Sequence, residues 1–120
     1  MQQVFFDCKN IKTLNLSTFN TSLVQSMHEM FRGCSSLIML DLTNFNLSLV
    51  NNMYNIFEGC ENLTILNLTN LSVSMRTNMD NNINLNSKKL KYINFKNACS
   101  SELSKCDNLF KNIPNNIIKS

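Results

Sequence analysis

One period dominates this sequence: similar residues return every 26 positions. The string MHEMFRGCSSL at positions 27–37 returns as MYNIFEGCENL at positions 53–63, and Cys8, Cys34 and Cys60 follow the same spacing. In the asparagine-rich stretch NNINLNSKK the spacing lengthens to 27 residues. A fixed period between about 20 and 50 residues is typical of repeat proteins, whose units bury their apolar faces only by stacking on one another. The period therefore predicts a stack of similar units.

The length of 120 residues fits a single domain. We expect this domain to be a segment of a longer protein, because the chain begins within a unit and shows no secretion signal. The predicted units are a partial repeat at 1–10 and four repeats at about 11–36, 37–62, 63–89 and 90–120.

Each repeat begins with the pattern L-x-x-L-x-L, as in LIMLDLTNF and LTILNLTNL. Alternation of apolar and polar residues over the central positions predicts a short strand. We expect the middle leucine of each strand to stack on its counterparts in a parallel sheet. The residues concerned are Leu14, Leu40, Leu66 and Ile93.

The second half of each repeat carries a helical pattern. Val24, Met27 and Phe31 lie at i, i+3 and i+7, which predicts one apolar stripe of a short helix. We expect each helix to end at a residue with positive φ, a conformation that suits Gly, Asn and Asp. These predicted positions are Asp7, Gly33, Gly59, Asn86 and Asn112.

These features together predict an α/β repeat fold. It is a leucine-rich-repeat-type solenoid with about four short parallel strands and short helices on the opposite side. We expect it to be right-handed, because crossovers between parallel strands strongly prefer that hand. Leucine-rich repeats usually place Asn or Cys in the turn after the strand, whereas this chain has Phe19, Phe45 and Leu71. We therefore expect an apolar plug in this turn and no amide ladder.

Residues 11–63, with TSLVQSMHEMFRGCSSL and its repeat, closely resemble the BspA-like leucine-rich-repeat surface proteins. The resemblance weakens in the third repeat, where Arg76 replaces the valine and the Gly-Cys pair is lost. It implies a non-enzymatic surface or extracellular module for adhesion or protein binding, with a host or matrix protein as partner. Because the chain shows no signal peptide, an intracellular interaction scaffold in the cytoplasm is the alternative.

The net charge is +3, and seven lysines lie from Lys88 onward with two acidic residues. This basic end predicts a solvated face and no nucleic-acid site, because no aromatic or Arg-rich pattern accompanies it. No apolar run reaches the length of a membrane span.

The cysteines predict buried thiols and no metal or cofactor site. Cys8, Cys34 and Cys60 share one register without a C-x-x-C pair, and His28 is the single histidine. We expect Cys106 in the core and Cys99 as the most exposed thiol. His28 and Glu29 would point apart on a helix, so we predict no catalytic pair and no enzyme.

The outward positions of the predicted strands form the candidate binding face. An aliphatic and aromatic row beside a row of amides and one acid resembles the anatomy of a protein interface. The alternative is that these residues only satisfy strand packing. The candidate protein-binding residues are Thr13, Asn15, Met39, Asp41, Ile65, Asn67, Tyr92 and Asn94.

Overall fold

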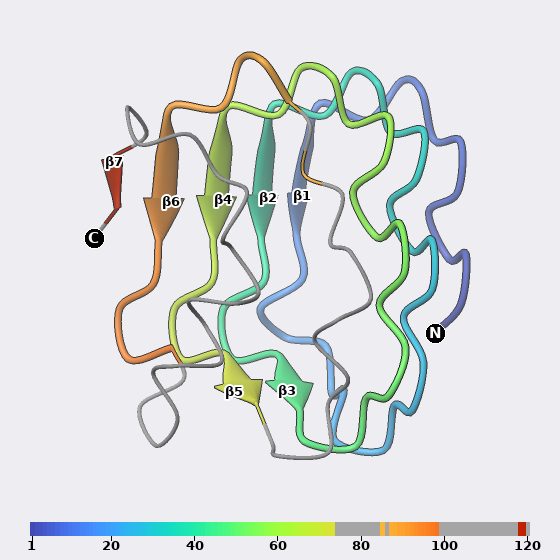
Figure 1. The fold of residues 1–120 in the computed structure, drawn as a ribbon, viewed down its shortest axis with the longest axis vertical. Coiled ribbons are helices and arrows are strands. Elements are labelled where there is room, and N and C mark those ends of the chain that lie inside the picture. Colours follow the sequence, from blue (N-terminus) through green and yellow to red (C-terminus); the bar gives the residue numbers. More distant parts are fainter. Residues whose placement is uncertain (74–84, 86, 99–117, 120) are drawn as a thin grey trace.

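The computed structural model describes residues 1–73, 85, 87–98 and 118–119. Five parallel strands form its main sheet, in the order β1-β2-β4-β6-β7, and lie side by side in Figure 1. A smaller parallel sheet pairs β3 with β5 below it in that view. The main strands are β1 (Thr13–Asn15), β2 (Met39–Asp41), β4 (Ile65–Asn67), β6 (Tyr92–Asn94) and β7 (Ile118–Lys119). The smaller sheet consists of β3 (Asn46–Leu47) and β5 (Ser72–Val73).

The pairing of the strands confirms the predicted repeat register. Leu14 pairs with Leu40, Leu40 with Leu66, and Leu66 with Ile93. The predicted four parallel strands are thus present in one sheet. β7 is a fifth strand that the sequence reasoning missed, although it continues the register, with Ile118 opposite Tyr92.

The helix prediction is wrong for the described residues, which contain turns where the helices were expected. The backbone N–H groups of Met27, Glu29, Phe31 and Gly33 donate to carbonyl oxygens 25 positions later, at 2.8–3.1 Å. A helix would use the same groups for bonds to residues four positions earlier. Here they join one coil, meaning a strand and its return path, to the next coil. The wall opposite the sheet is therefore built from turns bonded between coils.

Residues with positive φ recur at fixed positions along these turns. Asp7, Gly33 and Gly59 have φ of 56°, 76° and 75°, which confirms the prediction at three positions. Asn86 and Asn112 lie outside the described residues. A second series interrupts the predicted helices themselves, because Glu29 and Asn55 have φ of 52° and 53°. A left-handed residue within a segment ends a right-handed helix there.

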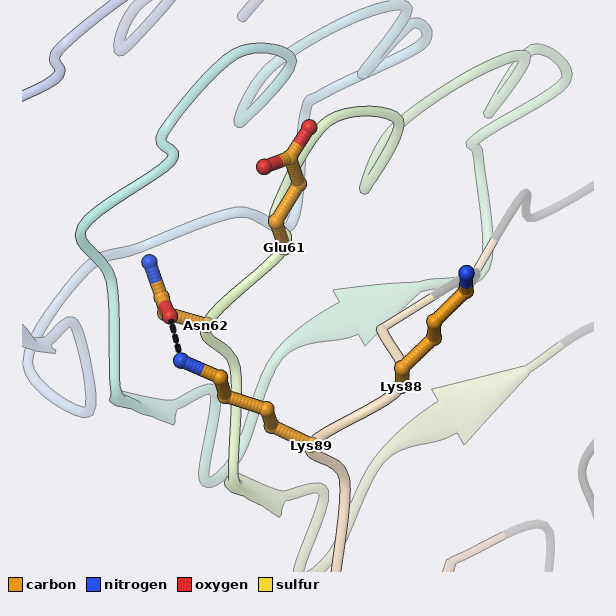
Figure 2. A pocket seen from close by; sticks show the side chains of 4 residues that line it. All are labelled: Glu61, Asn62, Lys88 and Lys89. Carbon is orange, nitrogen blue, oxygen red and sulfur yellow. Dashed lines mark hydrogen bonds between the residues drawn. The ribbon is translucent and has the colours of Figure 1, made fainter.

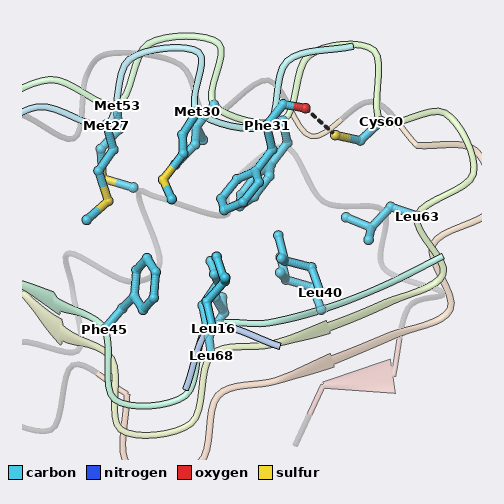
Figure 3. Close-up of a cluster of buried hydrophobic side chains, with 14 of the residues drawn as sticks. Leu16, Met27, Met30, Phe31, Leu40, Phe45, Met53, Cys60, Leu63 and Leu68 are labelled. Carbon is cyan, nitrogen blue, oxygen red and sulfur yellow. Dashed lines mark hydrogen bonds between the residues drawn. The ribbon is translucent and has the colours of Figure 1, made fainter. Parts of the chain in front are cut away.

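The core fills the space between the sheet and the turns. Met27, Met30 and Phe31 from the turns face Leu16 and Leu40 from the sheet side (Figure 3), and all five are at least 98% buried. Equivalent rings from successive coils stack nearly parallel, with centroids 5.7 Å apart for Phe5 and Phe31 and 5.9 Å for Phe31 and Phe57. Each coil thus completes the apolar surface of its neighbour, as a repeat requires.

The turn after the strand contains both an apolar plug and an amide ladder. Phe45 and Leu71 are buried, as predicted, whereas Phe19 in the first coil is 42% exposed. The exclusion of an amide ladder is wrong. One residue before each plug position, Asn70 donates to Asn44 at 2.9 Å, and Asn97 donates to Asn70 at 3.1 Å. These asparagines have φ of 56–65°, so the residue type serves both the backbone conformation and the ladder.

Candidate functional site

The structure brings the eight predicted binding residues together in two adjacent rows of the main sheet. Strand register places Thr13, Met39, Ile65 and Tyr92 opposite one another in the first row. The second row, called the Asn/Asp row below, consists of Asn15, Asp41, Asn67 and Asn94.

The first row contains the apolar part of this face. Met39 is 37% exposed, and Ile65 and Tyr92 are half-buried, whereas the leucines between the two rows are buried in β2 and β4. Met39, Ile65 and Tyr92, called the apolar row below, come from three neighbouring strands. Because such strands lie about 4.8 Å apart, the apolar row is continuous over about 10 Å. An aliphatic and aromatic strip therefore lies on the outward side of the sheet.

The Asn/Asp row has a structural role that sequence reasoning missed. In each of the four strands, the side-chain oxygen accepts a hydrogen bond from the backbone N–H two residues later, at 2.9–3.2 Å. These are Asx turns, in which a short side chain replaces a backbone partner where the strand ends. The signal was visible as Asn or Asp two residues before Ser or Thr in NLS, DLT and NLT.

Further hydrogen bonds fix the orientation of this row. Asp41 and Asn67 also accept from the hydroxyls of Thr43 and Thr69, and the Asn67 amide donates to the Thr43 hydroxyl at 3.0 Å. The row therefore presents preorganised polar groups beside the apolar row, with Asp41 as its one acid.

The thiols behave as packing groups. Cys34 and Cys60 are fully buried, and their Sγ atoms donate to the carbonyl oxygens of Phe5 and Phe31 at 3.0 and 3.1 Å. Burial raises the pKa of Cys34 to about 11 and that of Cys60 to about 12, which keeps both thiols protonated and unreactive at neutral pH. Cys8 is half-buried.

Two of the thiol predictions concern residues that the structure does not describe. Cys99 and Cys106 lie outside the described residues, and the reactivity of Cys99 stays a prediction. Within the described ranges, no group of three or more His, Cys, Asp and Glu residues could hold a metal ion.

His28 and Glu29 lie closer together than the helix prediction implied, because the segment forms a turn. His28 Nδ1 is 3.9 Å from Glu29 Oε2. The Glu29 side chain is 9% exposed and is bound by Arg32 and by the amide of Gln3, the latter at 2.8 Å. The hydrogen bond from Gln3 is the main cause that lowers the pKa of Glu29, and Arg32 adds to it. Arg32 also pairs with Glu58 of the next coil at 2.8 Å. Arg32 therefore links Glu29 of its own coil to Glu58 of the neighbouring coil by ion pairs.

The described parts of the chain contain no helix long and apolar enough to cross a membrane.

The fold and the two outward rows define a repeat-like protein whose five-stranded parallel sheet carries a mixed apolar and polar face. The chain belongs to the family described as Mycoplasma protein of unknown function, DUF285, whose model matches residues 1–116. No curated protein and no solved structure matches the chain.

Proposed function

We propose that this chain is a non-enzymatic binding module that recognises a protein partner through the outward face of its main sheet. We further propose that the fold is a right-handed solenoid of the leucine-rich-repeat type. The parallel strands that return every 26 or 27 residues support this class, as does the strong right-handed preference of parallel crossovers.

The apolar row is the observation that carries the proposal. Single exposed apolar residues are common on any protein surface and need no explanation. Here, however, Met39, Ile65 and Tyr92 occupy one register line on three adjacent strands, so they offer a partner one continuous strip. Interfaces concentrate their energy in a few aromatic or large apolar anchors surrounded by polar groups. The Asn/Asp row supplies such polar groups in fixed positions, which lowers the entropy lost on binding.

The resemblance of residues 11–63 to BspA-like surface proteins supports a location and a partner class. We propose a module at the cell surface that adheres to a host or extracellular matrix protein.

A binding measurement with matched tyrosine variants tests this proposal. The protein is passed over a panel of immobilised matrix proteins, and the affinity of Tyr92→Ala is compared with that of the parent chain. We expect a loss of more than about 1 kcal/mol, or roughly fivefold in Kd, as is typical of an interface anchor. Met39→Ala and Ile65→Ala should weaken the same interaction.

Tyr54→Ala is the control for loss of a tyrosine. Tyr54 lies in the wall of turns, is 46% exposed and stacks on His28 at 5.8 Å. The Tyr54→Ala substitution should leave the affinity for the matrix protein unchanged. The proposal fails if none of the three apolar-row substitutions changes the affinity for a partner that does bind. It also fails if Tyr92→Ala unfolds the protein, because the ring then serves packing.

A further inference from the structure

A concentration of lysines lies along the edge of the sheet where the strands begin. Lys12 precedes β1, and Lys88, Lys89 and Lys91 precede β6 in the segment SKKLKY at 87–92. We call these four residues the basic edge. Among the residues that the structure describes, none of the four forms an ion pair, in contrast to Lys9, which pairs with Asp7 at 3.7 Å. Their charges are therefore available to a negatively charged ligand.

Two adjoining hollows lie within this edge. The first has a volume of about 430 Å³ and is lined by Glu61, Asn62, Lys88 and Lys89 (Figure 2). The second has a volume of about 350 Å³ and is lined by Lys12, Ser36, Ile38, Asn62, Thr64 and Lys89. Asn62 and Lys89 line both hollows, so the two hollows adjoin at these residues, and together they are called the groove below.

Hydrogen bonds position the residues shared by the two hollows. The Lys89 ammonium donates to the Asn62 side-chain oxygen, and the Asn62 amide nitrogen donates to the Ser35 carbonyl at 2.6 Å. Lys89 is thereby held between the hollows, with Lys88 on the far side of the first (Figure 2) and Lys12 in the second. Glu61 is the one acid among the lining residues that the structure describes.

The donors in this groove suit an extended, sulfated ligand. Lysine ammoniums bind sulfate or phosphate as point charges, and the Ser36 hydroxyl can donate a hydrogen bond to a sugar or sulfate oxygen. The Thr64 hydroxyl donates to the Asn62 carbonyl at 3.1 Å and can accept a hydrogen bond from a sugar hydroxyl. Lys12 lines the second hollow and Lys88 lines the first, on coils three strand spacings apart, about 14 Å along the stack, so a ligand that contacts both lysines has to extend over the two hollows. Among the described residues, no aromatic ring and no arginine lines either hollow, whereas single-stranded nucleic acids are bound by stacking on aromatic rings.

We propose that the basic edge binds a sulfated polysaccharide of the glycosaminoglycan class. None of the described residues that line the two hollows belongs to the apolar row, so this site adds a second type of ligand to the proposed protein binding.

Heparin is the probe, and binding is measured by isothermal titration and by the salt concentration that elutes the protein from a heparin column. We expect the full chain to be retained at about 0.15 M salt and to elute as added salt screens the contacts. Lys12→Ala, Lys88→Ala and Lys89→Ala should each raise the Kd by about two- to fivefold, the range expected for one exposed ion pair. Lys88 makes no hydrogen bond or ion pair with described residues, so its variant tests the charge without disturbing the fold.

Lys96→Ala is the matched control, because Lys96 is an exposed lysine of the same coil that follows β6 at the opposite edge of the sheet. It should leave the Kd unchanged, and so should Tyr92→Ala, which keeps this test independent of the proposed protein binding. The proposal is overturned if heparin does not bind, or if Lys96→Ala weakens binding as much as Lys88→Ala. Equal affinity for unsulfated hyaluronan, or tighter binding of a DNA of matched charge, would also overturn it.

Discussion

Replacing Gly33 by alanine tests how closely the coils approach one another. Gly33 has φ of 76°, and a residue with a Cβ loses roughly 1–2 kcal/mol in that left-handed conformation. An added Cβ would also lie 2.1 Å from Asp7 Oδ1 and 3.3 Å from Asp7 Cα of the preceding coil. The Asp7 side chain is half exposed and can rotate away, which costs its contact with Lys9, worth at most about 1 kcal/mol.

We therefore expect Gly33→Ala to lower the free energy of unfolding by about 1–3 kcal/mol, measured by urea denaturation followed by circular dichroism. The substitution is also made in an Asp7→Ala background, which removes the carboxylate oxygen that the new Cβ would meet. The cost of Gly33→Ala should then fall by about 0.5 kcal/mol or more, because the two residues are in contact. A cost below about 0.5 kcal/mol in the parent chain, or the same cost in both backgrounds, would refute the close approach.

Three further predictions follow from described contacts. Cys34 and Cys60 should resist maleimide labelling in the folded protein at about pH 8 and react once urea unfolds it, because burial keeps both thiols protonated. The Gln3 hydrogen bond lowers the pKa of Glu29 below its ordinary 4.5, so the stability that this carboxylate contributes is present above about pH 4.5 and is lost as the pH falls further. Glu29→Gln should flatten that acid limb in denaturation curves measured across pH. Asn70→Ala should cost about 1–2 kcal/mol in urea denaturation, since it breaks two ladder bonds and replaces asparagine, which tolerates positive φ, with alanine, which tolerates it less well. Asn70→Gly should cost less, because it removes only the ladder bonds.

The strand half of each repeat was predictable because its signal is local and its period is strict. Alternation around Leu14, Leu40 and Leu66 determined which residues face inward, and the period then determined their register. The positive φ at Asp7 and Gly33 followed from residue types that tolerate that conformation. The same two arguments placed all eight candidate residues on the outward face.

The other half could not be predicted because its apolar spacing is compatible with two structures. Val24, Met27 and Phe31 fit a helical stripe, yet a series of turns also directs a side chain inward every few residues. The choice depends on backbone hydrogen bonds to a coil 25 positions away, which local periodicity does not report. The positive φ of Glu29 could not be predicted from its residue type, because glutamate is a good helix former. The Asx turns of the Asn/Asp row were missed because the asparagines were considered only as surface groups.

The hydrogen bonds between coils have a mechanical consequence. Each described coil holds its neighbour through a row of parallel N–H to carbonyl bonds, and the described residues contain no helix that could stretch separately. A force that pulls the two ends of the stack apart would open one such row at a time, from an end inward. Every released coil of 26 residues would add roughly 90 Å of extended chain. A stack of this kind would lengthen in steps under load. Each coil that has not yet been released would keep its outward side chains in place.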